Sequence, residues 1–119
     1  MKKILLVEDT AHLAEELVDI LTMEGFHVDL ATNGLEGIAF LSNNLPDLII
    51  TDLLMPKMDG FEFIEKVRSK SETSSIPIVV LSAKTSDVER KKVEEIGANK
   101  FIPKPCKAHE LVSCVKSLL

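Results

Sequence analysis

Two runs of uncharged residues, Leu48–Thr51 and Ile76–Leu81, constrain the fold more than any other feature of this chain. A short apolar run of this kind is typical of a β-strand that is buried on both faces. Strands of that type occur in parallel sheets, because the connections between parallel strands place helices on both sides of the sheet. The chain is therefore expected to contain a parallel sheet and enough helices to cover two faces.

Strand and helix patterns alternate five times, with connections of only a few residues. Strands are predicted over residues 3–7, 26–31, 48–51, 76–81 and 99–103, and helices are predicted to begin near Thr10, Asn33, Asp59, Ser86 and Lys107. Side chains that can cap a helix mark three of these starts: Asn33 with Glu36, Asp59 with Glu62, and Ser86 with Glu89. Gly25 and Gly97 are predicted to end the first and fourth helices.

This alternation predicts an α/β fold with a single doubly wound, five-stranded parallel sheet and five helices. The first, third and fourth strands are the most apolar and are expected in the centre, with the alternating second strand and the short fifth strand at the edges. Right-handed crossovers and helices on both faces then favour the strand order 2-1-3-4-5, which is a flavodoxin-like arrangement. In such a sheet, ligands bind beyond the carboxyl ends of the strands, here between strands one and three.

The length of 119 residues predicts one domain over residues 1–119. A formal net charge of -5 argues against nucleic-acid binding, because the surface would repel phosphate backbones. No apolar run approaches the roughly 20 residues that span a bilayer, and Met1–Lys3 with the short run after it does not form a signal peptide. We therefore expect a cytoplasmic protein with no membrane partner and no direct nucleic-acid contact by this domain, so any DNA contact would need another domain. Met1 is interpreted as a genuine start, either of a stand-alone protein or of the first domain of a longer one.

Cys106 and Cys114 are predicted to lie on the last helix. Eight residues of helix would separate them by about 12 Å, which is too far for a disulfide. No C-x-x-C spacing is present to suggest a metal site. Both are interpreted as reduced, buried or half-buried thiols.

Polar side chains follow four of the five predicted strands. Glu8 and Asp9 follow the first strand, Asp52 the third, Ser82 the fourth and Lys104 the fifth. Parallel strands end at the same edge of the sheet, so these groups should converge there. Three carboxylates repel one another unless a cation lies between them, and an all-oxygen ligand set suits Mg²⁺. The set predicts a cradle in which a phosphoryl group is transferred to Asp52, with Lys104 and Ser82 on its flanks.

The sequence resembles a response-regulator receiver domain of bacterial two-component signalling, from Ile4 to the last helix. The motifs that carry the resemblance are Val7-Glu8-Asp9, Asp52 with Met55-Pro56-Lys57-Met58-Asp59-Gly60, Ser82-Ala83 and Lys104-Pro105. Each motif is common by itself, whereas four of them in this order and at these spacings are very specific. The order 2-1-3-4-5 is also that of receiver domains, so the strand order and the resemblance are not independent.

The resemblance implies a role for each matching residue. Asp52 would accept a phosphoryl group from the phosphohistidine of a sensor histidine kinase or phosphotransfer protein. Lys104 would pair with the phosphoryl oxygens, and the peptide bond between Lys104 and Pro105 would be cis. The implied Mg²⁺ ligands are Asp9, Asp52, the backbone carbonyl of Leu54 and, mostly through water, Glu8.

The resemblance also implies a conformational switch. The hydroxyl of Ser82 would move towards the phosphoryl group while the ring of Phe101 turns inward, which would reshape the face made by the fourth helix, fifth strand and fifth helix. That face would control an output or a partner, and in many members it forms a homodimer on phosphorylation. Such a domain assists its own phosphorylation and dephosphorylation but is not an enzyme with a separate substrate. Leu54 and Lys84 occupy positions that tune dephosphorylation in the family.

Three other interpretations start from the same residues. A phosphatase of the haloacid-dehalogenase type needs a second acid two residues after its nucleophile, where this chain has Leu54. A flavodoxin-like cofactor binder needs a phosphate loop after the first strand, where Glu8 and Asp9 would repel phosphate. A pseudo-receiver that acts only by binding is the main alternative, and it is disfavoured because every reactive position is filled. Phe101 also has a plain interpretation, as an edge-strand aromatic residue that packs without switching.

Overall fold

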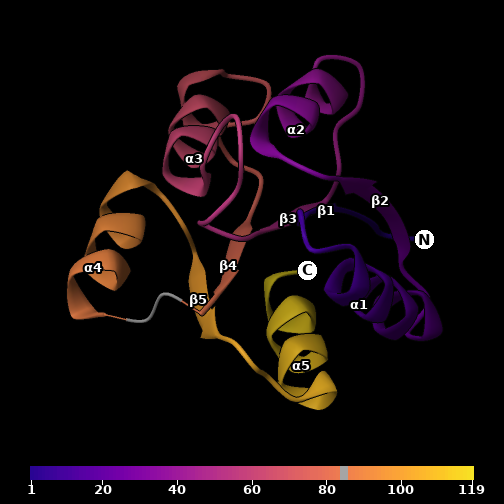
Figure 1. Ribbon diagram of the computed structural model, residues 1–119. Helices are drawn as coiled ribbons and strands as arrows, with labels where there is room; N and C mark the ends of the chain where they lie inside the picture. The colour runs from indigo at the N-terminus through magenta and orange to yellow at the C-terminus, as the bar shows by residue number, and fades with distance from the viewer. Residues whose placement is uncertain (84–85) are drawn as a thin grey trace.

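The computed structural model describes residues 1–83 and 86–119. Lys84, one of the two positions expected to tune dephosphorylation, lies outside the described residues. The described chain forms β1 (Lys3–Val7), α1 (Ala11–Met23), β2 (His27–Ala31), α2 (Gly34–Leu41), β3 (Leu48–Thr51), α3 (Gly60–Ser69), β4 (Ile78–Ser82), α4 (Asp87–Ile96), β5 (Lys100–Pro103) and α5 (Ala108–Leu118), as Figure 1 shows.

The five strands form one sheet in the order β2-β1-β3-β4-β5, and every neighbouring pair is parallel. This confirms the predicted fold class and strand order. The register places Val7 of β1 opposite both Ala31 of β2 and Thr51 of β3. The residues that follow β1 and β3 therefore emerge side by side from one edge of the sheet.

Helices cover both faces of the sheet. Residues of α2, α3 and α4 pack with one face, where the core includes Leu41, Phe63 and Val93. Residues of α1 and α5 pack with the other face, where the core includes Leu17 and Leu111. All members of β3 and β4 are buried, as expected for central strands. None of the helices in residues 1–83 and 86–119 is long and apolar enough to cross a bilayer.

The predicted capping residues lie at the helix starts. The side chains of Asn33, Asp59 and Ser86 accept hydrogen bonds from backbone N–H groups in the first turns of α2, α3 and α4, at 3.0, 3.0 and 3.4 Å. Gly25 and Gly97 follow α1 and α4 with φ of 93° and 114°, the left-handed conformation that favours glycine. These local signals therefore set the ends of the helices as predicted.

Two boundary predictions were wrong. β4 begins at Ile78 and not at Ile76, because Pro77 has no N–H to give to the sheet. Cys106 does not share a helix with Cys114, because α5 begins only after its N-cap Lys107. Both thiols are nevertheless free and half-buried, as predicted, and burial raises the pKa of both.

Candidate functional site

Asp52 directly follows β3 and is fixed at the carboxyl edge of the sheet. Its backbone N–H donates to the carbonyl of Val7 at 3.2 Å, which keeps the end of β3 against the end of β1. Its Oδ1 atom accepts from the backbone N–H of Leu53 at 2.6 Å and, more weakly, from that of Leu54 at 3.4 Å. Only 7% of the residue is exposed. One carboxylate oxygen is therefore held by the backbone while the other faces the remaining polar groups.

Lys104 joins the acids of two strands. Its Nζ atom lies 2.7 Å from Asp52 Oδ2 and 2.9 Å from Glu8 Oε1, and the three side chains are largely buried. The backbone N–H of Lys104 donates to the carbonyl of Ser82 at 2.9 Å, so the end of β4 positions the start of this side chain. Burial by itself would lower the pKa of Lys104, but the hydrogen bonds and charges of Asp52 and Glu8 outweigh it and raise the pKa above its ordinary value. The ammonium group is therefore fully charged at neutral pH.

Three acids converge at this edge. One ligand oxygen each of Glu8, Asp9 and Asp52 lie within 4.8 Å of one another, with Glu8 and Asp52 buried and Asp9 exposed. Asp9 does not cap α1, whose N-cap is Thr10 without a side-chain cap hydrogen bond. Glu8 already accepts from Lys104 through Oε1 and from the backbone N–H of Thr10 through Oε2, at 3.1 Å. The set is composed of hard oxygen donors and fits Mg²⁺, with Asp9 the acid most open to it.

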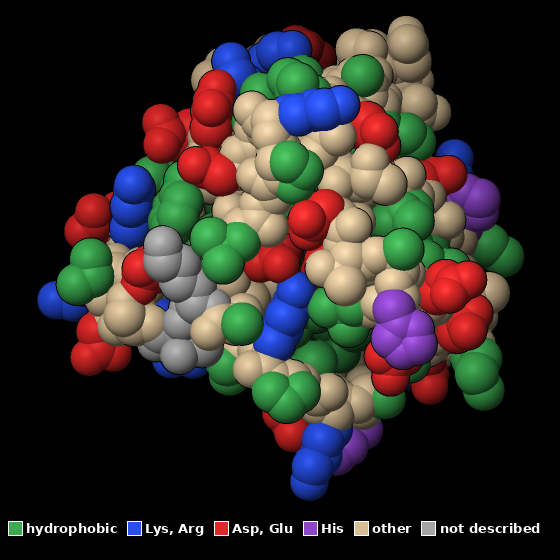
Figure 2. All heavy atoms as spheres, in the orientation of Figure 1, with side chains coloured by type: hydrophobic (Ala, Val, Ile, Leu, Met, Phe, Trp, Pro, Cys, Tyr) green, Lys and Arg blue, Asp and Glu red, His purple; other side chains and the backbone are tan. Residues whose placement is uncertain are grey.

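The same convergence is visible on the surface. Figure 2 looks onto the face where acidic side chains and a basic side chain meet near the middle, in a hollow between surrounding groups. A phosphorylated group of a partner could approach the acids from this side. The chemistry available here is nucleophilic attack by a carboxylate, with a neighbouring ammonium group to balance the charge.

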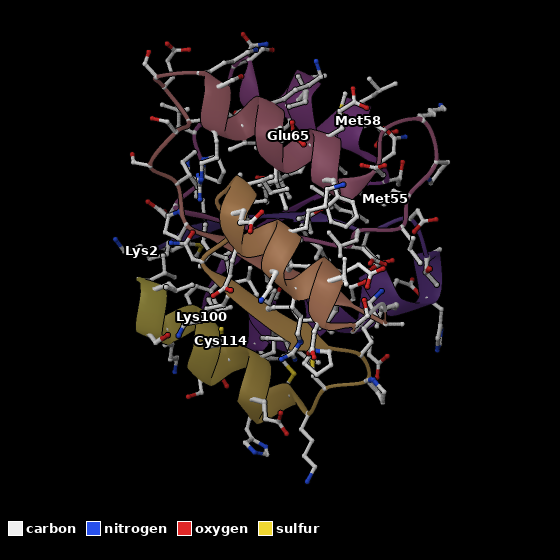
Figure 3. The ribbon with its side chains drawn as sticks, turned by 90° about the vertical axis from the view of Figure 1, so that its left-hand side faces the viewer. Lys2, Met55, Met58, Glu65, Lys100 and Cys114 are labelled. Carbon is white, nitrogen blue, oxygen red and sulfur yellow. The ribbon has the colours of Figure 1, made fainter. Side chains whose placement is uncertain are left out.

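The loop between β3 and α3 folds back onto Asp52. The N–H of Gly60 donates to the carbonyl of Leu53 at 2.9 Å, and a Cβ atom at Gly60 would overlap the Asp52 carbonyl oxygen. Met58 is buried, and Met55 packs against the same core (Figure 3). Sequence reasoning placed Gly60 in a motif but missed its close approach to Asp52.

The two proposed switch residues lie in different places. Ser82 is fully buried at the end of β4, at the same sheet edge as Asp52. Phe101 lies opposite Val80 within β5 and is half-buried on the face covered by α4. The guanidinium carbon of Arg90 lies 4.9 Å from the centroid of its ring. Phe101 therefore packs on the same side of the sheet as α4, and its role as a switch residue stays a prediction.

Arg68 was missed by sequence reasoning. In the last turn of α3, it donates from Nε to the carbonyl of Gly97 at 2.9 Å, from Nη1 to that of Ile76 at 2.7 Å and from Nη2 to Asn99 Oδ1 at 3.0 Å. Burial lowers the pKa of its guanidinium group. Since basic residues are common in the last turn of any helix, the sequence contains no signal for these long-range contacts. Arg68 fastens the end of α4 to the starts of β4 and β5.

Comparison with known proteins gives consistent matches. The family model of the response regulator receiver domain matches residues 4–116. The transcriptional regulatory protein CpxR homolog of Haemophilus influenzae is 37% identical over 119 residues, covering 100% of this chain and 51% of that protein. The chain therefore spans about half the length of that curated relative.

Solved structures give the same result. The signal receiver domain of a signal transduction histidine kinase from Syntrophus aciditrophicus is 39% identical, with a TM-score of 0.94 over 100% of this chain and 90% of that one. The chemotaxis protein CheY4 of Vibrio cholerae is 31% identical, with a TM-score of 0.95 over 100% of this chain and 99% of that one. Receiver domains are phosphorylation-controlled switches of two-component signalling and not classical enzymes, and they work with histidine kinases or phosphotransfer proteins. By its fold, its sequence and its matches, the chain belongs to the response-regulator receiver domain family.

Proposed function

We propose that residues 1–119 act as a receiver domain in which Asp52 accepts a phosphoryl group from the phosphohistidine of a histidine kinase or phosphotransfer protein. The observation that carries this proposal is the bridge from Lys104 to both Asp52 and Glu8, at 2.7 and 2.9 Å. A buried ammonium group between two buried carboxylates offsets their negative charge, and the carboxylate of Asp52 beside it is the nucleophile that the reaction requires.

In the proposed transfer, a carboxylate oxygen of Asp52 attacks the phosphorus atom of the phosphohistidine. A phosphorus–oxygen bond forms, the phosphorus–nitrogen bond breaks, and its electron pair returns to the imidazole of the partner. Lys104 stays beside the reacting oxygens and offsets their negative charge. The N–H of Leu53 keeps Asp52 Oδ1 in place during the transfer.

The acids around Asp52 support a role for Mg²⁺. Asp9, Asp52 and the backbone carbonyl of Leu54 would hold the ion, with Glu8 acting mostly through water because both of its oxygens already accept hydrogen bonds. When bound, the ion would neutralise the charge on the phosphoryl oxygens.

The proposed output is a change of the α4–β5–α5 face, which is turned towards the viewer in Figure 3. Ser82 would move towards the phosphoryl group and Phe101 would turn inward, away from Arg90. A homodimer through this face on phosphorylation is part of the proposal. Light scattering with and without a phosphodonor tests that part, and an unchanged mass would reject it.

Intact-mass measurement tests the acceptor directly. The protein is incubated with acetyl phosphate, with and without Mg²⁺, beside Asp52→Ala and the control Asp19→Asn, which removes an exposed acid of α1. One phosphoryl adduct that needs Mg²⁺, persists in Asp19→Asn and is lost in Asp52→Ala is expected. No adduct under any condition would favour the pseudo-receiver alternative, in which the domain acts only by binding.

The phosphatase alternative has no support from the comparisons, which identify a receiver domain. Its general acid is also lacking, since Leu54 occupies that position and is 55% exposed beside the site. The phosphatase alternative would require sustained release of phosphate from small phosphate esters, well beyond one turnover per molecule.

A further inference from the structure

The outer side of β2 is an open sheet edge. β2 is the first strand in the sheet order, and no strand within the described residues pairs with its outer side (Figure 1). The N–H of His27 donates to Lys2 and the carbonyl of Ala31 accepts from Glu8, so these residues point their backbone groups at β1. Since backbone directions alternate along a strand, Val28 and Leu30 point their N–H and carbonyl groups outward.

This edge lacks the usual protection. β5, at the other edge of the sheet, contains Lys100 and Pro103, two residue types that discourage pairing with another strand. β2 contains neither lysine nor proline, and Leu30 is 46% exposed on it. The one formally charged side chain of β2 is Asp29, and its carboxylate lies 3.2 Å from His27 Nε2. An open edge of this composition is suited to pairing with a strand of matching pattern.

We propose that β2 pairs antiparallel with β2 of a second copy of this chain, about a twofold axis at Val28. In that pairing, Val28 faces the partner's Val28, and each donates its N–H to the other's carbonyl. The outward N–H of Leu30 meets the carbonyl of the partner's Phe26. The N–H of Phe26 is already bonded to the carbonyl of Leu21 at 3.1 Å and is not needed.

The side chains match on both faces of this pairing. On the face covered by α1, Leu30 lies opposite the partner's Phe26, which is an apolar contact. On the other face, His27 lies opposite the partner's Asp29, in a pair that is not hydrogen-bonded through the backbone and whose side chains are therefore close. His27 and Asp29 side chains are 50% and 38% exposed, so both are accessible to a partner.

Charge selects this register over its neighbours. A shift of the partner strand by two residues in one direction places Asp29 opposite the partner's Asp29, which is repulsive. A shift by two residues in the other direction places His27 opposite the partner's His27 and leaves both carboxylates without a partner across the interface. A shift by a single residue would pair the outward-facing residues of one strand with residues of the partner whose backbone groups point at its own β1. The alternation of backbone directions along β2 therefore excludes such a shift. Only the register centred on Val28 places an imidazole opposite a carboxylate at both cross-strand positions.

The resulting dimer leaves phosphotransfer unhindered. Because the two β2 strands run in opposite directions, the carboxyl edges of the two sheets lie at opposite ends of the dimer. Each Asp52 then remains open to its own partner protein. The interface is short, and an interface of this size gives a weak, concentration-dependent dimer. The inference does not rest on the proposed phosphotransfer, and its test uses unphosphorylated protein.

Sedimentation velocity over a concentration series up to about 1 mM, where weak interfaces of this class associate, is the test. Leu30→Lys places a charge at the apolar contact and is expected to weaken the dimer about tenfold or more. Val88→Lys is the matched control, since Val88 is an exposed apolar residue of α4, 76% exposed, and this change is expected to leave the dimer intact. Amide exchange by NMR should slow at Val28 and Leu30 as the concentration rises.

A charge swap sharpens the test. His27→Asp places carboxylates opposite one another and should weaken the dimer. Adding Asp29→Lys should restore it, because each carboxylate then lies opposite an ammonium group of the partner strand. A monomer at every concentration, or a dimer lost in Val88→Lys but not in Leu30→Lys, would overturn the proposal. So would a double variant no better than His27→Asp alone, provided that circular dichroism shows all variants folded.

Discussion

The corner after β3, which we define as Thr51 to Gly60, and the helix α4 are held in place by different kinds of contact. From Thr51 to Gly60 the chain is fixed by buried side chains, backbone hydrogen bonds to Asp52 Oδ1, and a glycine with no room for a side chain. In α4 the single buried residue is Val93. Ile96, at the end of the helix, is only partly buried against the same core. Contacts nearer the surface include Arg90 over Phe101, Lys92 over the ring of Phe61 at 4.4 Å, and the hydrogen bond of Arg68 to Gly97.

This contrast fits the two tasks of a switch protein, which are to accept a phosphoryl group and to change a surface in response. A group that must accept a phosphoryl group needs a fixed geometry, because small displacements of the nucleophile cost rate. A surface that must change needs few buried contacts, because such elements open at a lower free energy than the core. The following changes test whether the corner is rigid and whether α4 is weakly held.

Gly60→Ala should have the largest effect. The added Cβ would overlap the backbone of Asp52 and Leu53, so we expect a loss of about 2–4 kcal/mol in the free energy of unfolding, together with slower phosphorylation by acetyl phosphate. Gly25→Ala is the control: it has open space around it but a φ of 93°, and should cost only about 1 kcal/mol. Equal losses in the two variants, measured by urea unfolding, would show that the corner tolerates displacement.

Val93→Ala should come next, with a loss of about 2 kcal/mol from the removed methyl groups and the cavity left behind. Because Val93 is the buried anchor of α4, hydrogen exchange should accelerate more in α4 than in α3. Val88→Ala, at a position of the same helix that is 76% exposed, is the control and should change little. Equal acceleration in α3 and α4 would mean that α4 is no more weakly held than the rest.

Leu54→Asn should shorten the lifetime of the phosphorylated protein. Leu54 is an exposed apolar residue beside Asp52, and an amide there could hold a water molecule for attack on the phosphoryl group. A hydrogen bond worth about 1 kcal/mol in that step corresponds to about a fivefold faster decay. Leu45→Asn, at a leucine that is 58% exposed and distant from Asp52 in the fold, should leave the decay unchanged. The decay is followed by intact mass, and identical rates for the two variants would remove this role from Leu54.

Arg90→Ala should have the smallest effect on stability. Loss of the cation–π contact with Phe101 is expected to cost about 0.5–1 kcal/mol. The ring resonances of Phe101 in NMR spectra should shift, because the ring loses its cover. Lys91→Ala, an exposed neighbour on α4, is the control. Unshifted Phe101 resonances in Arg90→Ala would show that Arg90 does not hold the ring in solution.

The sequence predicted the strand order, the helix caps and the meeting of Glu8, Asp52 and Lys104, because these follow from patterns that are local or shared by all parallel sheets. It did not predict features that depend on long-range packing. The linker residue Thr73, for example, is buried, and its hydroxyl donates to the carbonyl of Val67 at 2.6 Å. The contacts of Arg68 with Gly97, and the tight approach of Gly60 to Asp52, likewise join segments whose meeting no local pattern reveals.

Hydrogen exchange followed by mass spectrometry, before and after phosphorylation with acetyl phosphate and Mg²⁺, tests the central contrast most directly. We expect the exchange of α4 and β5 to change while that of α2 and α3 stays the same, and we expect no change in Asp52→Ala. A uniform change across all helices, or a change that Asp52→Ala shows equally, would contradict the view that a rigid acceptor corner drives a weakly held α4.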